Sequence, residues 1–305
     1  MKNSLFFPLV LISACFFFGC QGTNNAQSSK GTLSQLPDFE SKYIGSRNIE
    51  IYLPPGYEQN SNERYPVLYM HDGQNLFNGA TGYSGQEWRM DENLDSLIAL
   101  GQIEPCIVVG PWNATVARFT EYMPQAPVQN LPDSVKAGLD NQLLAALSAD
   151  RYLKFLVEEL KPYIDTNYRT KADPPNTFLA GSSMGGLISM YTIANYPAIF
   201  GGAACLSTHW PISLDNSTPA VAHAVIDFFG ENLPDPSNHQ LYFDFGTEGL
   251  DAFYEPYQQR MDVRLREKGY TKGKNWLSQK FPGDGHNERS WANRMALPLT
   301  FLLGK

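Results

Sequence analysis

The feature that most constrains the fold is a regular alternation of strand-like and helix-like segments. Short apolar runs recur along the chain, and segments with helical periodicity separate most of them. Such alternation favours a largely parallel sheet covered by helices on both faces, and so predicts an α/β fold. The expected strands are residues 48–53, 65–70, 106–110, 176–180, 201–207, 240–245 and 275–281, and the expected helices are residues 91–100, 150–164, 185–196, 252–268 and 289–303.

Two parts of the chain depart from the alternation. Residues 43–54 resemble a hairpin that feeds an antiparallel edge. Residues 115–148 contain three prolines, which exclude a long helix. We expect this second stretch to be a surface excursion over the strand ends, where substrate contacts are usually carried. Without internal repeats or a composition change after residue 35, residues 41–305 are predicted to form one domain.

The N-terminus has the pattern of an export signal. Residues 1–19 combine Lys2 with an apolar run too short to span a membrane stably. The segment ending at Cys20 resembles a bacterial lipobox, in which the cysteine is lipidated; residues 20–40 would then be a flexible polar tether. The prediction is an exported lipoprotein, anchored to a membrane through Cys20 and facing the periplasm or the cell surface. Simple secretion is the alternative.

Charge and cysteine usage limit the possible partners. The formal net charge is -8 and the sequence has no basic stripe, so no nucleic-acid partner is expected. Cys106 and Cys205 lie in strand-like runs and are predicted to be buried free thiols. No His, Cys, Asp or Glu cluster has metal-ligand spacing, so neither a metal nor another cofactor is expected. We therefore expect the substrate to be a neutral or cationic small molecule, or a neutral polymer.

A strand, a tight turn and a helix meet at residues 177–188. The turn reads Gly181-Ser182-Ser183-Met184-Gly185, and its glycines allow strand and helix to approach closely around a strained central residue. This context predicts a nucleophile elbow that exposes the Ser183 hydroxyl. The amide of Met184 would then be free at a helix N-terminus to stabilise an oxyanion.

A serine nucleophile needs a base, and five histidines are available. Hydrolases with this elbow follow the chain order Ser, acid, His, which excludes His71 and favours His286 in its glycine-rich loop. His209, at the end of another strand, either touches substrate or is structural. His223 and His239 are expected to be structural.

The acid is expected on the loop after strand 240–245, where it can orient the base. Asp251 and Glu248 are both candidates, and we favour Asp251 because Glu248 can be occupied in ordering the turn. The second oxyanion donor is expected in the loop after residue 70. Gly73 permits an unusual backbone path there, which favours the amide of Gln74; the alternative is a tight turn capped by Asp72.

Several motifs together resemble one family of α/β-hydrolases, described as putative esterases. It includes enterochelin esterases, feruloyl and acetylxylan esterases, S-formylglutathione hydrolases and mycolyltransferases. The motifs are residues 68–77 (LYMHDGQNLF), 181–186, 246–247 and 285–288 with Trp291.

The resemblance covers residues 43–303 and implies the α/β-hydrolase fold. It also implies a Ser-acid-His triad with Ser183 and His286, and oxyanion amides at Gln74 and Met184. The family's Gly-x-x-Asp spacing falls on Gly249 in this chain, so reaching Asp251 requires a two-residue insertion.

Residues 108–122 look similar to a pocket-lining stretch of bacterial family members. Trp112 offers a stacking face, and Arg118 offers a clamp for a carboxylate or hydroxyl. We therefore expect substrate contacts from Trp112, Asn113, Arg118 and His209. A structural pair between Arg118 and Glu121 is the alternative for Arg118.

These observations predict a serine carboxylic-ester hydrolase that works through an acyl-enzyme. Acyl groups attached to sugars are the first expectation for its substrate, by analogy of fold, and siderophore esters are the second. The alternatives are an acyltransferase on the same fold and a ligand-binding lipoprotein without turnover. The sequence does not predict an oligomeric state.

Overall fold

The computed structural model describes Met1 and residues 30–137, 139–214 and 217–305. One eight-stranded sheet runs through this part of the chain in the order β1-β2-β4-β3-β5-β6-β7-β8. The pairs β1/β2 and β2/β4 are antiparallel, and every pair from β3 onward is parallel. The predicted α/β class and mostly parallel sheet are therefore confirmed. The predicted export signal and Cys20 lie outside the described residues.

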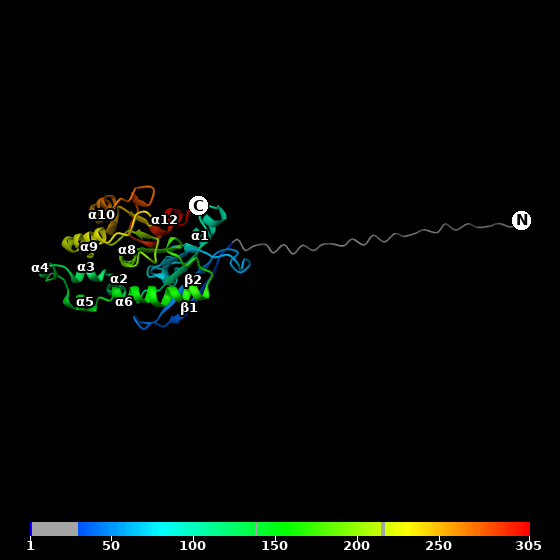
Figure 1. The fold of residues 1–305 in the computed structure, drawn as a ribbon, viewed down its shortest axis with the longest axis horizontal. Helices are drawn as coiled ribbons and strands as arrows, with labels where there is room; N and C mark the ends of the chain where they lie inside the picture. Colours follow the sequence, from blue (N-terminus) through cyan, green and yellow to red (C-terminus); the bar gives the residue numbers. More distant parts are fainter. Residues whose placement is uncertain (2–29, 138, 215–216) are drawn as a thin grey trace.

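The observed elements follow the predicted alternation closely (Figure 1). The strands are β1 (Thr32–Phe39), β2 (Arg47–Leu53), β3 (Val67–Met70), β4 (Ile107–Pro111), β5 (Thr177–Ser182), β6 (Gly202–Leu206), β7 (Gln240–Phe245) and β8 (Trp276–Lys280). The longer helices are α1 (Met90–Ala99), α8 (Met184–Asn195), α9 (Pro219–Glu231), α10 (Glu255–Lys268), α11 (Glu288–Arg294) and α12 (Ala296–Leu303). One further rod combines α6 (Ala149–Lys154), a π-helical segment η2 (Phe155–Leu160) and α7 (Lys161–Asn167).

Strand β1 corrects the prediction of a tether up to residue 40. Residues 32–39 pair with β2 in register from Thr32 with Leu53 to Phe39 with Arg47, so the folded body includes them. All but two of their side chains are exposed. Hydrogen bonding to a neighbouring strand, rather than burial, holds this edge, which explains why its polar sequence resembles a linker.

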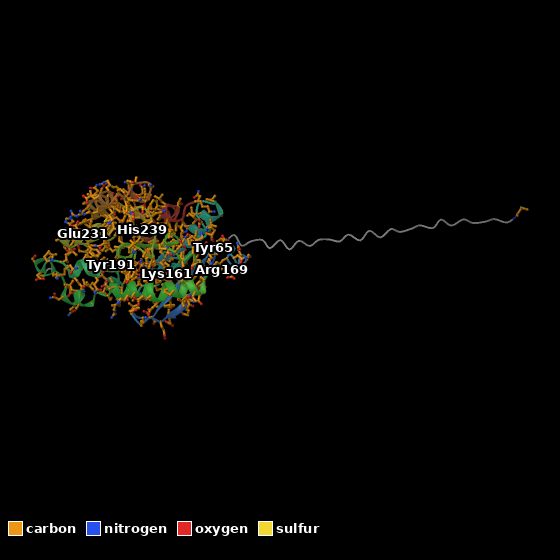
Figure 2. The ribbon with its side chains drawn as sticks, in the orientation of Figure 1. Tyr65, Lys161, Arg169, Tyr191, Glu231 and His239 are labelled. Atoms are coloured by element: carbon orange, nitrogen blue, oxygen red, sulfur yellow. The ribbon has the colours of Figure 1, made fainter. Side chains whose placement is uncertain are left out.

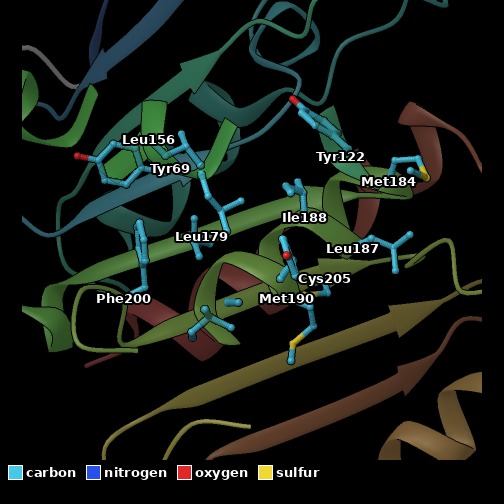
Figure 3. Packing of buried hydrophobic residues seen from close by; sticks show 14 of the residues in the cluster. Tyr69, Tyr122, Leu156, Leu179, Met184, Leu187, Ile188, Met190, Phe200 and Cys205 are labelled. Atoms are coloured by element: carbon cyan, nitrogen blue, oxygen red, sulfur yellow. The ribbon is translucent and has the colours of Figure 1, made fainter. Parts of the chain in front are cut away.

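The central strands are buried on both faces, as expected for a covered parallel sheet. Val67 and Tyr69 of β3 belong to the core cluster under the α6–η2–α7 rod, α8, α9 and α10. Their neighbours Leu68 and Met70 belong to the cluster under α1, α11 and α12. Figure 3 shows the first cluster, where side chains of α8 pack with those of β5 and β6. Helices thus pack on both faces of the sheet and hold the strand ends in position.

The proline-containing stretch holds short helices only: α2 (Arg118–Tyr122), α3 (Gln125–Gln129), α4 (Asp133–Lys136) and α5 (Asn141–Ala146). It is less superficial than predicted, because Tyr122, Met123 and Val128 are buried in the main core.

Both cysteines of the described residues are buried and free, which confirms that prediction. Burial raises the pKa of the Cys106 thiol to about 12. Within the same residue ranges, no helix has the length and apolar character that crossing a bilayer would require.

Candidate active site

The turn between β5 and α8 has the geometry of a nucleophile elbow. Ser183 has φ 57° and ψ -122°, a left-handed conformation that is rare for a residue with a side chain. Its amide donates to the carbonyl oxygen of Leu206 at 2.9 Å, and its own carbonyl accepts from the amide of His209 at 3.2 Å. The end of β6 therefore holds the strained residue in place.

Glycine at position 181 is what lets the turn close. A Cβ atom there would lie 2.7 Å from the backbone carbonyl of Gly185, closer than real Cβ contacts allow. At Gly185 a Cβ atom would meet only ordinary contacts, at 3.4 Å from Asp72 and 3.5 Å from His71. The first glycine of the motif is thus sterically required, whereas the second has room.

His286 lies on the loop after β8 and contacts one of the two candidate acids. Its Nδ1 is 2.6 Å from Oδ1 of Asp251, on the 3₁₀ helix η4 (Gly249–Phe253) after β7. Glu248 is exposed and lies outside this contact. Asp251 is 1% exposed. Burial alone would raise its pKa, but hydrogen bonds from His286, Ser207 and the Gly246 amide outweigh burial and hold the pKa below its usual range.

The second carboxylate oxygen of Asp251 is also fully engaged. It accepts from the hydroxyl of Ser207 and from the amide of Gly246, each at 2.6 Å. The Ser207 oxygen in turn accepts from Trp291 Nε1 at 2.9 Å and from Arg294 Nη2 at 2.8 Å. Because two donors already point at that oxygen, the Ser207 hydrogen is directed to Asp251. The carboxylate cannot rotate without breaking this set.

Arg294 extends the network into the sheet. Its guanidinium pairs with Asp244 of β7 at 2.9 Å, and with Asp284 at 3.0 Å. Asp244 is buried, and it also accepts from the hydroxyl of Tyr242 at 2.9 Å. Helix α11 and the ends of β6 and β7 are therefore joined behind the His–Asp pair by charge-assisted hydrogen bonds.

Aromatic rings surround the imidazole of His286. The Trp291 ring lies edge-on at 5.0 Å between centroids, and the Tyr254 ring does so at 5.7 Å. Tyr254 also hydrogen-bonds through its hydroxyl to Nδ1 of His209 at 2.8 Å. His209 is 3% exposed and is not among the residues that line the cavity described below, so its contact with substrate stays a prediction. In this structure it supports Tyr254.

The turn after β3 forms the opposite wall of the site. It continues into a short 3₁₀ helix, η1 (Gly73–Asn75), and Gly73 approaches Gly110 so closely that a Cβ atom would lie 1.9 Å from that carbonyl oxygen. Within the described residues, the amides of Gln74 and Met184 donate to no other protein atom. Met184 directly follows Ser183, and Gln74 lines the same cavity as Ser183, so these two N–H groups are candidates for an oxyanion hole.

Asp72 is held by the stretch after β4. Arg118 binds its carboxylate with two hydrogen bonds of 2.7 and 2.6 Å, and the Asn113 amide adds a third at 2.7 Å. Burial would raise the pKa of Asp72, but the Arg118 charge outweighs it and the pKa is lowered. The alternative pair between Arg118 and Glu121 is not formed, because Glu121 binds Arg47 at 3.0 Å. Arg118 and Asn113 thus shape the wall.

These groups surround one cavity of about 570 Å³, within the usual range for small-molecule sites. Ser183 and His286 lie in its wall with Gln74, Trp112, Asn113 and Arg118. Trp112 is anchored through its indole N–H to Glu50 at 3.0 Å. The wall also includes Tyr83, whose side chain is 92% exposed.

Two of the remaining histidines, His71 and His239, are held by hydrogen bonds within the fold, whereas His223 is exposed. The Nδ1 of buried His71 is 2.9 Å from the Tyr152 hydroxyl, and burial lowers the pKa of His71 to about 4. His239 (Figure 2) has ring nitrogens 2.9 Å from the carbonyl oxygens of Asp235 and Pro197. Across the described ranges, no three His, Cys, Asp or Glu side chains gather into a metal site.

The sequence analysis did not identify the residues behind the site. Ser207, Arg294, Asp244 and Tyr254 touch the His–Asp pair directly or through one neighbour, yet none sits in a recognisable motif. Glu288 was noted only within a family motif. It lines the cavity and accepts from Ser84 at 2.8 Å. The one available signal was that Ser207 directly follows a strand; Asp244 lies within strand β7 and had no such signal.

Comparison with known proteins settles the family. Residues 41–296 match the family model described as "Putative esterase". The chain belongs to this esterase family. The predicted family is thus confirmed, and the molecule is an ester-hydrolysing enzyme of the α/β-hydrolase fold.

Relatives and solved structures agree with that assignment. The esterase is 25% identical over 90% of its length to uncharacterized protein YbbA of Bacillus subtilis, of which it covers 98%. It is 30% identical over 58% of its length to an endo-1,4-β-xylanase/feruloyl esterase of Xylanibacter ruminicola, but spans only 22% of that larger protein. A solved ferulic acid esterase superposes with a TM-score of 0.63 at 19% identity, covering 90% of this chain and 98% of the other, which shows a shared fold.

Proposed function

We propose that Ser183 attacks an ester carbonyl, that His286 transfers the proton, and that Asp251 orients His286. The observation that carries this proposal is the 2.6 Å contact between His286 and Asp251 at the cavity that also holds the strained Ser183. The free amides of Gln74 and Met184 would stabilise the oxyanion, and water would release the acyl group.

We further propose that the acyl group is attached to a carbohydrate. The relative from Xylanibacter ruminicola is named for both xylanase and feruloyl esterase activity, which supports a plant-polysaccharide ester. The cavity is also suited to an aromatic or acyl group beside polar groups, because Trp112 and Trp291 line it together with Asn113 and Thr115.

Removing the nucleophile tests this mechanism. We expect Ser183→Ala to lower kcat for 4-nitrophenyl acetate by roughly 10⁴-fold or more, since triad members act as a unit. A fluorophosphonate probe should label the wild-type protein at Ser183 and leave the variant unlabelled, as peptide mass spectrometry would show. Labelling at another serine, or full activity of the variant, would overturn the assignment.

We also propose that the esterase is exported and anchored through a lipid on Cys20. The support is the sequence pattern alone, because these residues lie outside the described part of the chain. In a bacterial host, the wild-type protein should incorporate labelled palmitate and sediment with membranes, whereas Cys20→Ala should do neither. Equal fractionation of both proteins would contradict the anchor.

A further inference from the structure

A second hollow, of about 470 Å³, adjoins the catalytic cavity on the side of the antiparallel edge. We call it the hairpin groove: it lies between residues 33–35 of β1, Glu50 of β2 and residues 73–81. Gln74 and Thr81 line both the groove and the catalytic cavity. The two spaces therefore meet at the turn that carries the proposed oxyanion donor.

One carboxylate connects the two spaces chemically. Glu50 Oε1 accepts from Gln35 Nε2 at 2.6 Å and from Trp112 Nε1 at 3.0 Å, and Trp112 belongs to the catalytic cavity. Its other oxygen, Oε2, accepts no hydrogen bond from the described residues. A ligand in the groove would thus find a fixed, charged acceptor whose position is tied to the cavity wall.

The chemistry of the groove suits a neutral, hydroxyl-rich ligand. Gln35 and Asn78 offer amide donors and acceptors, and none of the described residues that line the groove is a lysine or arginine. An anionic ligand would find no counter-charge there. Phe77 adds an apolar surface, since its ring is stacked on Tyr52 at 6.3 Å and only partly buried. Amides, a carboxylate and a fixed ring are suited to a sugar, which has both hydroxyls and apolar C–H faces.

We propose that the hairpin groove binds a neutral sugar unit of the substrate while the acyl group occupies the catalytic cavity beside Ser183. This subsite rests on the proposed esterase function, and it deepens that function by assigning the alcohol side of the ester to strand β1. Recognition by Gln35, Glu50 and Asn78 would select carbohydrate esters over small esters without interfering with the chemical step.

Binding without turnover tests the groove by itself. We expect the Ser183→Ala protein to bind unesterified xylotetraose in titration calorimetry. Adding Gln35→Ala or Asn78→Ala should weaken that binding roughly three- to tenfold, the size expected for one lost hydrogen bond. Gln59→Ala, an exposed glutamine away from the groove, is the matched control and should bind as before. Equal affinity of all four proteins would overturn the subsite and leave Gln35 and Glu50 as a cross-strand pair only.

Kinetics separate this proposal from the esterase proposal. In the enzyme that retains Ser183, the Gln35→Ala substitution should lower kcat/KM for acetylated xylotetraose three- to tenfold relative to kcat/KM for 4-nitrophenyl acetate. Equal losses on both substrates would contradict the subsite. If neither ester is hydrolysed although xylotetraose binding still depends on Gln35, the sugar site stands and the esterase mechanism fails.

Discussion

Asp251 and Glu248 occupy the same loop after β7, but only Asp251 has its carboxylate against His286. We expect Asp251→Asn to lower kcat by about 10³- to 10⁴-fold, because the amide cannot hold the productive tautomer of the imidazole. Glu248→Gln should retain nearly full activity. Steady-state kinetics on 4-nitrophenyl acetate would check both variants, and a collapse in Glu248→Gln alone would reverse the assignment.

Individual residues can be predicted from the sequence when neighbouring elements or chain order indicate their role. Ser183 follows a strand and precedes a helix, and His286 comes last in the chain order, so both could be placed. The contact between Ser207 and Arg294 could not be predicted, because it joins residues 87 positions apart that carry no local pattern. His209 was ambiguous for the same reason: only packing shows that its ring contacts the Tyr254 hydroxyl.

The two glycines of the elbow differ in what their positions can accept. We expect Gly181→Ala to lower the melting temperature and to slow fluorophosphonate labelling of Ser183 strongly, because the new Cβ would force β5 and α8 apart. Gly185→Ala should fold at least as well as the wild type, since space exists and alanine favours a helix by about 0.5–1 kcal/mol. Thermal unfolding and labelling rates measured side by side would check this, and equal destabilisation of both variants would contradict it.

Among the elements, the central strands were predictable and the edge was not. Buried parallel strands need continuous apolar runs, so β3 to β7 appear in the sequence within one or two residues of their observed ends. Strand β1 is half of a two-stranded edge and needs only backbone partners. Its side chains are free to be polar, and a polar strand is indistinguishable from a linker until its partner is known.

For the whole molecule, two buried histidines predict sensitivity to mild acid. Burial lowers the pKa of His71 and of His209 to about 4, whereas an unfolded histidine titrates near 6.5. Between these pH values the unfolded chain binds more protons than the folded chain. The stability that the two neutral histidines contribute is therefore complete above about pH 6.5 and is lost as the pH falls towards 4. When the pH falls from about 8 to about 5, each histidine should lower the free energy of unfolding by about 2 kcal/mol.

Urea unfolding at the two pH values would measure this loss. On the same acidification the His209→Asn variant should lose about 2 kcal/mol less unfolding free energy than the wild type, because the contribution of buried His209 is removed. His223→Gln, at an exposed helix position, is the matched control and should keep the full wild-type loss. An unchanged pH dependence in His209→Asn would contradict the role assigned to its burial.

The two cysteines of the described body bear on how its fold is held together. Cys106 directly precedes strand β4, and Cys205 lies in strand β6. Both thiols are free and buried, and burial raises the pKa of each. A thiol that stays protonated and out of reach of solvent reacts slowly with oxidants and with other thiols. The fold of residues 30–137, 139–214 and 217–305 therefore does not depend on a disulfide.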